Sequence, residues 1–137
     1  MADFVKFQSA AGAIVNGAHN LDADTLKIAL SNVAPNPATA ALLSNIMQIA
    51  TAGGYTAGGR TVANTDVTVA GGIATLDGDN VVFTATGQMG PARYAVLYND
   101  TAPGKPLLGF WDRGVSATLY ENDTLTVVFG TAIITLS

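Results

Sequence analysis

The chain has 137 residues and a net charge of −4, and it is 49% hydrophobic but only 12% charged. This length suits a single domain, residues 1–137, with one core of its own. The six Lys and Arg residues are scattered singly, which excludes a basic stripe for nucleic acid. The absence of Cys excludes disulfides and thiol chemistry, and no apolar run is long enough to predict a membrane span.

The low charge bears on association. Charged residues make up 12% of the chain, about half the ~25% of an average domain. A surface so poor in charge resists association weakly. It favours a subunit of an assembly, such as a homodimer or homotrimer, over a monomer with a polar but uncharged surface.

The N-terminal segment predicts strands. We expect a short strand or extended arm near residues 3–8 and a second strand near 12–18, because Gly12 and Gly17 would interrupt a helix. These are either ordinary first strands or, for residues 1–9, an arm that pairs with a neighbouring subunit. The alternation of Leu26, Ile28 and Leu30 then predicts a half-buried strand over 25–32.

One stretch has helical spacing. After a proline loop at 34–37, the apolar residues Leu42, Leu43, Ile46, Met47 and Ile49 recur at intervals near three and four. The pattern predicts one short helix at 38–49 whose apolar face covers an open end of the sheets.

A glycine-rich segment follows at 53–59. It lacks the Lys-Ser or Lys-Thr of a phosphate-binding loop, so it predicts a wide loop with few contacts whose glycines adopt positive φ. The next residues, 60–69, are rich in Thr and Val and predict a strand with a break around Asn64.

From Gly71 onward, short apolar runs alternate with turn signals. Asp77-Gly78 predicts a hairpin turn, and Asn99-Asp100-Thr101 predicts an exposed turn. Such spacing predicts an all-β fold, an antiparallel β-sandwich of about eight strands that is jelly-roll-like. The predicted core positions are Leu26, Ile28, Leu30, Ile46, Leu76, Phe83, Val96, Leu108, Phe110, Leu125, Val127 and Ile134.

Residues suited to catalysis are few. His19 is the only His, so imidazoles of one chain cannot build a metal site. The segment 77–80 resembles the start of a calcium loop but lacks its terminal Glu. No Ser lies in a nucleophile elbow. We therefore expect no catalytic residue, no metal and no cofactor.

Arg93 has two interpretations. It could form a cross-strand pair with Asp112 that fixes the register of neighbouring strands. Alternatively, it belongs to an exposed aromatic and arginine patch with Tyr94, Tyr98, Trp111 and Tyr120, of the kind found at interface cores.

The segments 53–62 (GGYTAGGRTV), 80–88 (NVVFTATGQ), 92–114 and 123–137 carry a resemblance. Together they resemble small virion structural proteins of tailed bacteriophages, and more narrowly the jelly-roll-type head decoration or cement proteins. The resemblance implies a non-enzymatic protein, made in the cytoplasm of a bacterial host, that binds the outside of the capsid. There it would stabilise the shell by bridging subunits of the major capsid protein.

The contact regions expected for that role are the N-terminal arm, the glycine-rich loop and the turn 101–105. Their residues are Ala2, Asp3, Phe4, Lys6, Tyr55, Arg60, Thr101 and Lys105. Two other functions stay open. A phage tail or neck component that binds a receptor or carbohydrate would need exposed aromatic side chains in a groove. A small hydrolase would need two carboxylates close together in a pocket.

Overall fold

A computed structural model describes residues 3–136 of the chain. The predicted all-β antiparallel sandwich-like fold is confirmed. The described part has ten strands instead of about eight, one α-helix, α1 (Gln8–Val15), and one turn of 3-10 helix (Leu43–Asn45).

One layer of the sandwich is a five-stranded antiparallel sheet. Its strands, in spatial order, are β1 (Phe4–Lys6), β8 (Leu107–Leu119), β7 (Met89–Asn99), β2 (Leu26–Ser31) and β3 (Arg60–Thr61). The long β7–β8 pair forms its centre, as the apolar runs on either side of the turn 100–106 require.

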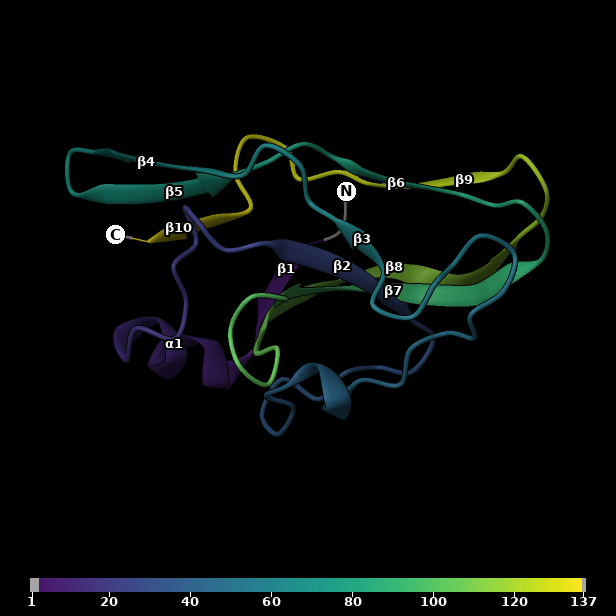
Figure 1. Ribbon diagram of the computed structural model, residues 1–137, viewed down its shortest axis with the longest axis horizontal. Coiled ribbons are helices and arrows are strands. Elements are labelled where there is room, and N and C mark those ends of the chain that lie inside the picture. Colours follow the sequence, from purple (N-terminus) through teal and green to yellow (C-terminus); the bar gives the residue numbers. More distant parts are fainter. Residues whose placement is uncertain (1–2, 137) are drawn as a thin grey trace.

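The second layer is divided into two small sheets that lie end to end over the first layer (Figure 1). The larger, the β4–β5–β10 sheet, has the order β10 (Ile134–Leu136), β5 (Ile73–Asp77), β4 (Asp66–Ala70). The smaller pairs β6 (Val81–Thr84) with β9 (Thr124–Val127). In Figure 1 the tip of the β4–β5 hairpin extends past the end of the five-stranded sheet.

Apolar side chains cover both faces of the five-stranded sheet. Leu26, Leu97 and Leu108 belong to the core between the layers, whereas Val96 and Phe110 belong to a second core on the opposite face. α1 and the loop that contains the 3-10 turn lie on this second side (Figure 1). The predicted core positions are buried, except that Leu125 and Ile134 are partly buried and pack against the core.

The predicted helix at 38–49 is wrong, because tertiary hydrogen bonds engage the backbone of this stretch. The N–H of Leu107 donates to the carbonyl of Ala41 (2.9 Å), and the N–H of Leu43 donates to the carbonyl of Lys105 (2.9 Å). Gln48 also forms a bridge with Ser31 of β2. An irregular segment that contains the 3-10 turn thus replaces the helix, and its apolar residue Ile46 still reaches the second core.

The N-terminal prediction is right in part. The strand expected near 3–8 exists as β1, and it pairs with β8 of its own chain. The strand expected near 12–18 is wrong, because residues 8–15 form α1. Gly12 is tolerated within this helix, where a Cβ would meet no atom within 4 Å.

Two turn predictions also need correction. Asp77-Gly78 is not a hairpin turn, because β5 pairs with β4 and β10 whereas β6 pairs with β9. The glycine-rich loop does have positive φ, but it is closely packed, since a Cβ at Gly59 would lie 1.7 Å from the carbonyl oxygen of Ile28. The break at Asn64 is confirmed by its φ of 55°.

Candidate functional site: an interaction surface

The acidic and imidazole side chains of residues 3–136 are not grouped in the ways that metal binding and glycoside hydrolysis require. Among residues 3–136, no group of three or more His, Cys, Asp or Glu is placed to hold a metal ion. None of the three clefts described below is lined by two carboxylates, the pair that a glycoside hydrolase needs. In the same range, neither α1 nor the 3-10 turn is long and apolar enough to span a bilayer.

One polar cluster joins the buried Asn99 with the partly buried His19 and Asp24. Asn99 is fully buried, so the prediction of an exposed turn at this residue is wrong. Its side-chain amide donates to Asp24 Oδ2 (2.7 Å) and lies 3.0 Å from His19 Nδ1, and its Oδ1 accepts the N–H groups of Thr101 and Ala102. These bonds tie residues 19–24 to the β7–β8 turn, which is a structural task.

Electrostatics at this cluster agree with that role. Burial lowers the pKa of His19, and the nearby charge of Asp24 opposes the shift only in part. The hydrogen bond from Asn99 lowers the pKa of Asp24. Because Asn99 Nδ2 can only donate, His19 accepts at Nδ1, while its buried Nε2 has no hydrogen-bond partner among residues 3–136.

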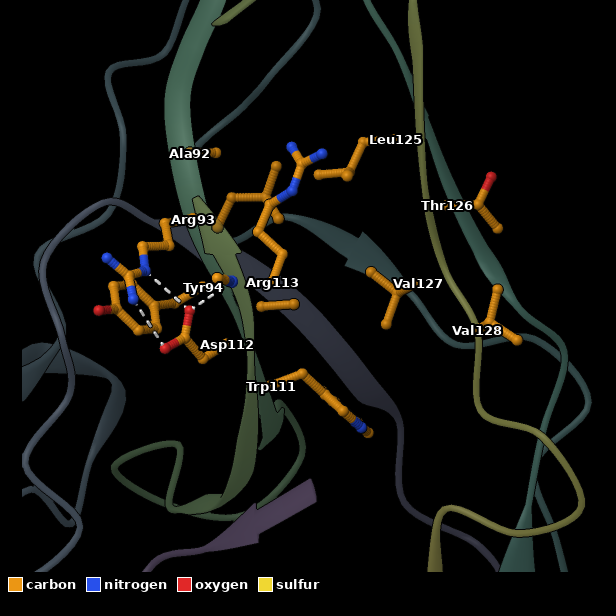
Figure 2. A pocket seen from close by; sticks show the side chains of 13 residues that line it. Ala92, Arg93, Tyr94, Trp111, Asp112, Arg113, Leu125, Thr126, Val127 and Val128 are labelled. Carbon is orange, nitrogen blue, oxygen red and sulfur yellow. Dashed lines mark hydrogen bonds and ion pairs between the residues drawn. The ribbon is translucent and has the colours of Figure 1, made fainter. Parts of the chain in front are cut away.

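The largest of the three clefts, about 720 Å³, lies between β8 and β9 where the two layers separate (Figure 2). Trp111 and Val127 face each other across it, whereas Asp112 points to the other side of β8. Its walls are mainly apolar. The Trp111 ring also packs against Phe4, with ring centroids 5.0 Å apart, and against Phe129, with ring centroids 5.4 Å apart.

The predicted cross-strand pair of Arg93 and Asp112 is confirmed. Arg93 donates to the carboxylate through Nε (2.8 Å) and Nη2 (3.1 Å), and this lowers the pKa of Asp112. The β7–β8 register shifts between Ala92 and Tyr94, and the guanidinium lies 5.3 Å from the Tyr94 ring centroid. The pair is half exposed, so it fixes register more than it stabilises the fold.

The alternative, an exposed aromatic patch, is wrong. Tyr94, Tyr98 and Trp111 are at most 8% exposed, and only Tyr120 is exposed, at 59%. Tyr98 donates its hydroxyl hydrogen to the carbonyl of Gly58 (2.5 Å). Buried rings cannot stack on a sugar, which counts against a carbohydrate-binding groove built from these residues.

The predicted contact residues do not form one surface. β1 and β3 are opposite edges of the five-stranded sheet, which separates the N-terminal residues from Arg60. Tyr55 is only 2% exposed, and its hydroxyl accepts the N–H of Leu30 (3.1 Å), so it is a core residue in this fold. Phe4 is half-buried, and Ala2 lies outside the described residues. The exposed members are Asp3, Lys6, Arg60, Thr101 and Lys105.

A different surface stands out in the structure, the apolar face of the β4–β5–β10 sheet. The register places its side chains in two rows, Val67–Leu76–Ile134 and Val69–Ala74–Leu136. The first row packs against the interlayer core, and its Leu76 is only 3% exposed. In the second row, Val69 is 72% and Leu136 56% exposed. A cleft of about 270 Å³ lies between this face and residues 14–22. Alternation at 66–70 and 73–77 signals such a face, but sequence reasoning missed it.

A second apolar surface lies on the loop after β2. Val33 is 52% and Met47 69% exposed, and they border a cleft of about 500 Å³. This loop covers the opposite face of the five-stranded sheet from the β4–β5–β10 sheet (Figure 1). The molecule therefore presents uncovered apolar side chains in two separate places, the β4–β5–β10 sheet and the loop after β2.

No protein-family model matches the chain, and neither the curated proteins nor the solved structures include a similar protein. The resemblance to phage decoration proteins consequently stays a prediction. What bears on function is the distribution of apolar, polar and charged groups in the structure itself.

Proposed function

We propose that this protein is a non-enzymatic structural component of a bacteriophage virion that binds the outside of the capsid and bridges subunits of the major capsid protein. The observation that carries the proposal is the presence of two separate apolar surfaces, one on the β4–β5–β10 sheet and one on the loop after β2. A bridging protein needs at least two separate contact surfaces, and exposed apolar patches mark interaction sites.

Charge supports the same role. With a net charge of −4, the chain suits an outer shell surface better than contact with packaged DNA. Many copies on a regular lattice would add weak individual contacts through avidity. The shell-binding surface in this proposal is the loop 33–47, because loops carry recognition residues and Met adapts to irregular partners.

The test mixes purified protein with capsids that lack it and measures bound protein by sedimentation and capsid survival on heating. We expect saturable binding and a higher temperature of capsid disruption. Met47→Glu should weaken binding at least about tenfold, because burying a Met side chain contributes about 1.5–3 kcal/mol.

Ser44→Glu is the matched control, since Ser44 is exposed on the same loop and the change adds the same charge. It should leave binding within about twofold of the unmodified protein. Absence of binding to any capsid preparation would remove the proposed role. Equal effects of the two substitutions would remove the loop as the contact surface.

A further inference from the structure

Strand β4 is an edge strand that lacks the usual protection against pairing. It has five residues, Asp66–Ala70, in regular register with β5, and it contains no Lys, Arg, Pro or bulge. The other sheet edges are shorter, and β1 and β3 carry Lys6 and Arg60. β6 and β9 have four residues each and lie over the five-stranded sheet. Long unprotected edges are templates for a further strand.

The backbone groups available on β4 follow from its hairpin. Gly71 and Gly72, with φ of 60° and 80°, form a two-residue turn, so Ala70 and Ile73 face each other as a hydrogen-bonded pair. Residues 66, 68 and 70 therefore bond to β5, and Val67 and Val69 point their N–H and C=O groups outward. The N–H and C=O of Val69 have no partner among residues 3–136, whereas the N–H of Val67 donates to Asp22 Oδ1 at 3.3 Å, a long bond that pairing with a second strand would replace.

We propose that β4 pairs antiparallel with β4 of a second copy about a two-fold axis at Thr68. Each three-stranded sheet then becomes half of a continuous six-stranded sheet. In this register Val67 lies opposite Val69 of the second copy, on the apolar face, and Asp66 lies opposite Ala70.

The residue pattern of β4 favours pairing with a second copy centred at Thr68, because Val67 and Val69 are placed symmetrically about this residue. A centre at Asp66 would place two carboxylates directly opposite each other, which destabilises a sheet. A centre at Val69 would place Val67 opposite Gly71, which has no side chain to pack. The Thr68 centre avoids both and brings Val69, 72% exposed, against an apolar neighbour.

The contact is one short strand on each side, so the dimer is weak and depends on concentration. Sedimentation velocity from about 1 µM to about 500 µM should show the sedimentation coefficient rise toward that of a dimer at the high end. The measurement contains no capsid, so its outcome is independent of the proposed virion role.

Two substitutions address the edge directly. Val69→Lys adds a charge of the kind that natural edges carry, and Val69→Pro removes an outward N–H that makes no internal bond. Each should weaken dimerisation at least about tenfold. Val115→Lys is the control, because Val115 is 62% exposed in β8, far from β4 in the strand order. Circular dichroism checks that each variant folds, and Val69→Lys decides the question if the proline variant does not.

A cysteine gives a positional test, because the chain has no Cys of its own. Thr68 of the two copies would form a non-hydrogen-bonded pair with Cα atoms about 4.5 Å apart, within disulfide range. Thr68→Cys should therefore oxidise to a covalent dimer, and Val115→Cys should not. A monomer at every concentration, a dimer that Val69→Lys does not weaken, or equal crosslinking at both cysteines would each overturn the proposal.

Discussion

Replacing Gly59 with Ala tests whether close packing against β2 is what requires glycine in the glycine-rich loop. Gly59 has φ +76°, and an added Cβ would lie 1.7 Å from the carbonyl oxygen of Ile28 in β2. Gly17 provides the control, because its φ of +78° is nearly the same but a Cβ there would meet nothing within 4 Å. The two substitutions share the cost of a left-handed backbone and differ only in the clash.

The shared cost is about 1–2 kcal/mol. At Gly59 the clash must also push the loop away from β2. That movement loosens β3, which pairs with β2 at Lys27 and Ile28, and the 2.8 Å hydrogen bond from the N–H of Val62 to the carbonyl of Leu26. Two or three hydrogen bonds at about 1 kcal/mol each add roughly 2–3 kcal/mol. The total at Gly59 is therefore about 3–5 kcal/mol.

Thermal unfolding followed by circular dichroism separates the two values. A loss of 1 kcal/mol lowers Tm by roughly 3–5 °C in a chain of this size, so Gly59→Ala should lower Tm by about 10–20 °C and Gly17→Ala by about 3–10 °C. Equal shifts for the two variants would show that the close approach to Ile28 is not what requires glycine at position 59, and the packing argument would fail.

Three further outcomes follow from the polar contacts. Burial lowers the pKa of His19 below its ordinary 6.5, so the unfolded chain binds a proton first as the pH falls. The free energy of unfolding should therefore be at its full value above about pH 6.5 and decrease below it. His19→Gln should reduce this dependence of stability on pH. Tyr55→Phe should cost about 1–3 kcal/mol in chemical denaturation, because the buried N–H of Leu30 loses its acceptor. Arg93→Ala should lower Tm far less, and the difference should shrink in about 0.5 M salt, since its ion pair is half exposed.

Local alternation in the sequence predicted the strand that is β2, and Leu26, Ile28 and Leu30 all belong to the interlayer core. The strand is not half-buried as predicted, because Ala29 and Ser31 on its other face are also buried. The helix at 38–49 failed because helical spacing of apolar residues also serves an irregular segment that lies along a sheet. The bonds that decide between them come from Pro106 and Leu107, more than sixty residues away. No local pattern contains that information.

The missed helix and the missed interaction surface have related causes. α1 has no capping side chain and buries only Ala10, so its sequence carries almost no helical signal. The alternation of Val67 and Val69 does indicate an apolar face. That β4 is an edge depends on the strand order β10–β5–β4, which places the last strand of the chain on the far side of β5. Edge position is a property of topology, and sequence periodicity does not specify topology.

The two proposed contacts, the β4 edge and the loop 33–47, are placed so that one copy can form both at the same time. The β4 edge and the loop 33–47 lie on opposite sides of the five-stranded sheet, so a copy held by its loop leaves its β4 edge free to pair (Figure 1). Two loops joined through β4 would bind a shell as a bivalent unit, and the second loop would then bind at an effective concentration set by the dimer geometry. Under those conditions a low affinity of the β4–β4 contact is sufficient. A Val69→Lys edge would protect the free monomer and remove this gain, which gives a physical reason for the lack of Lys and Arg in β4.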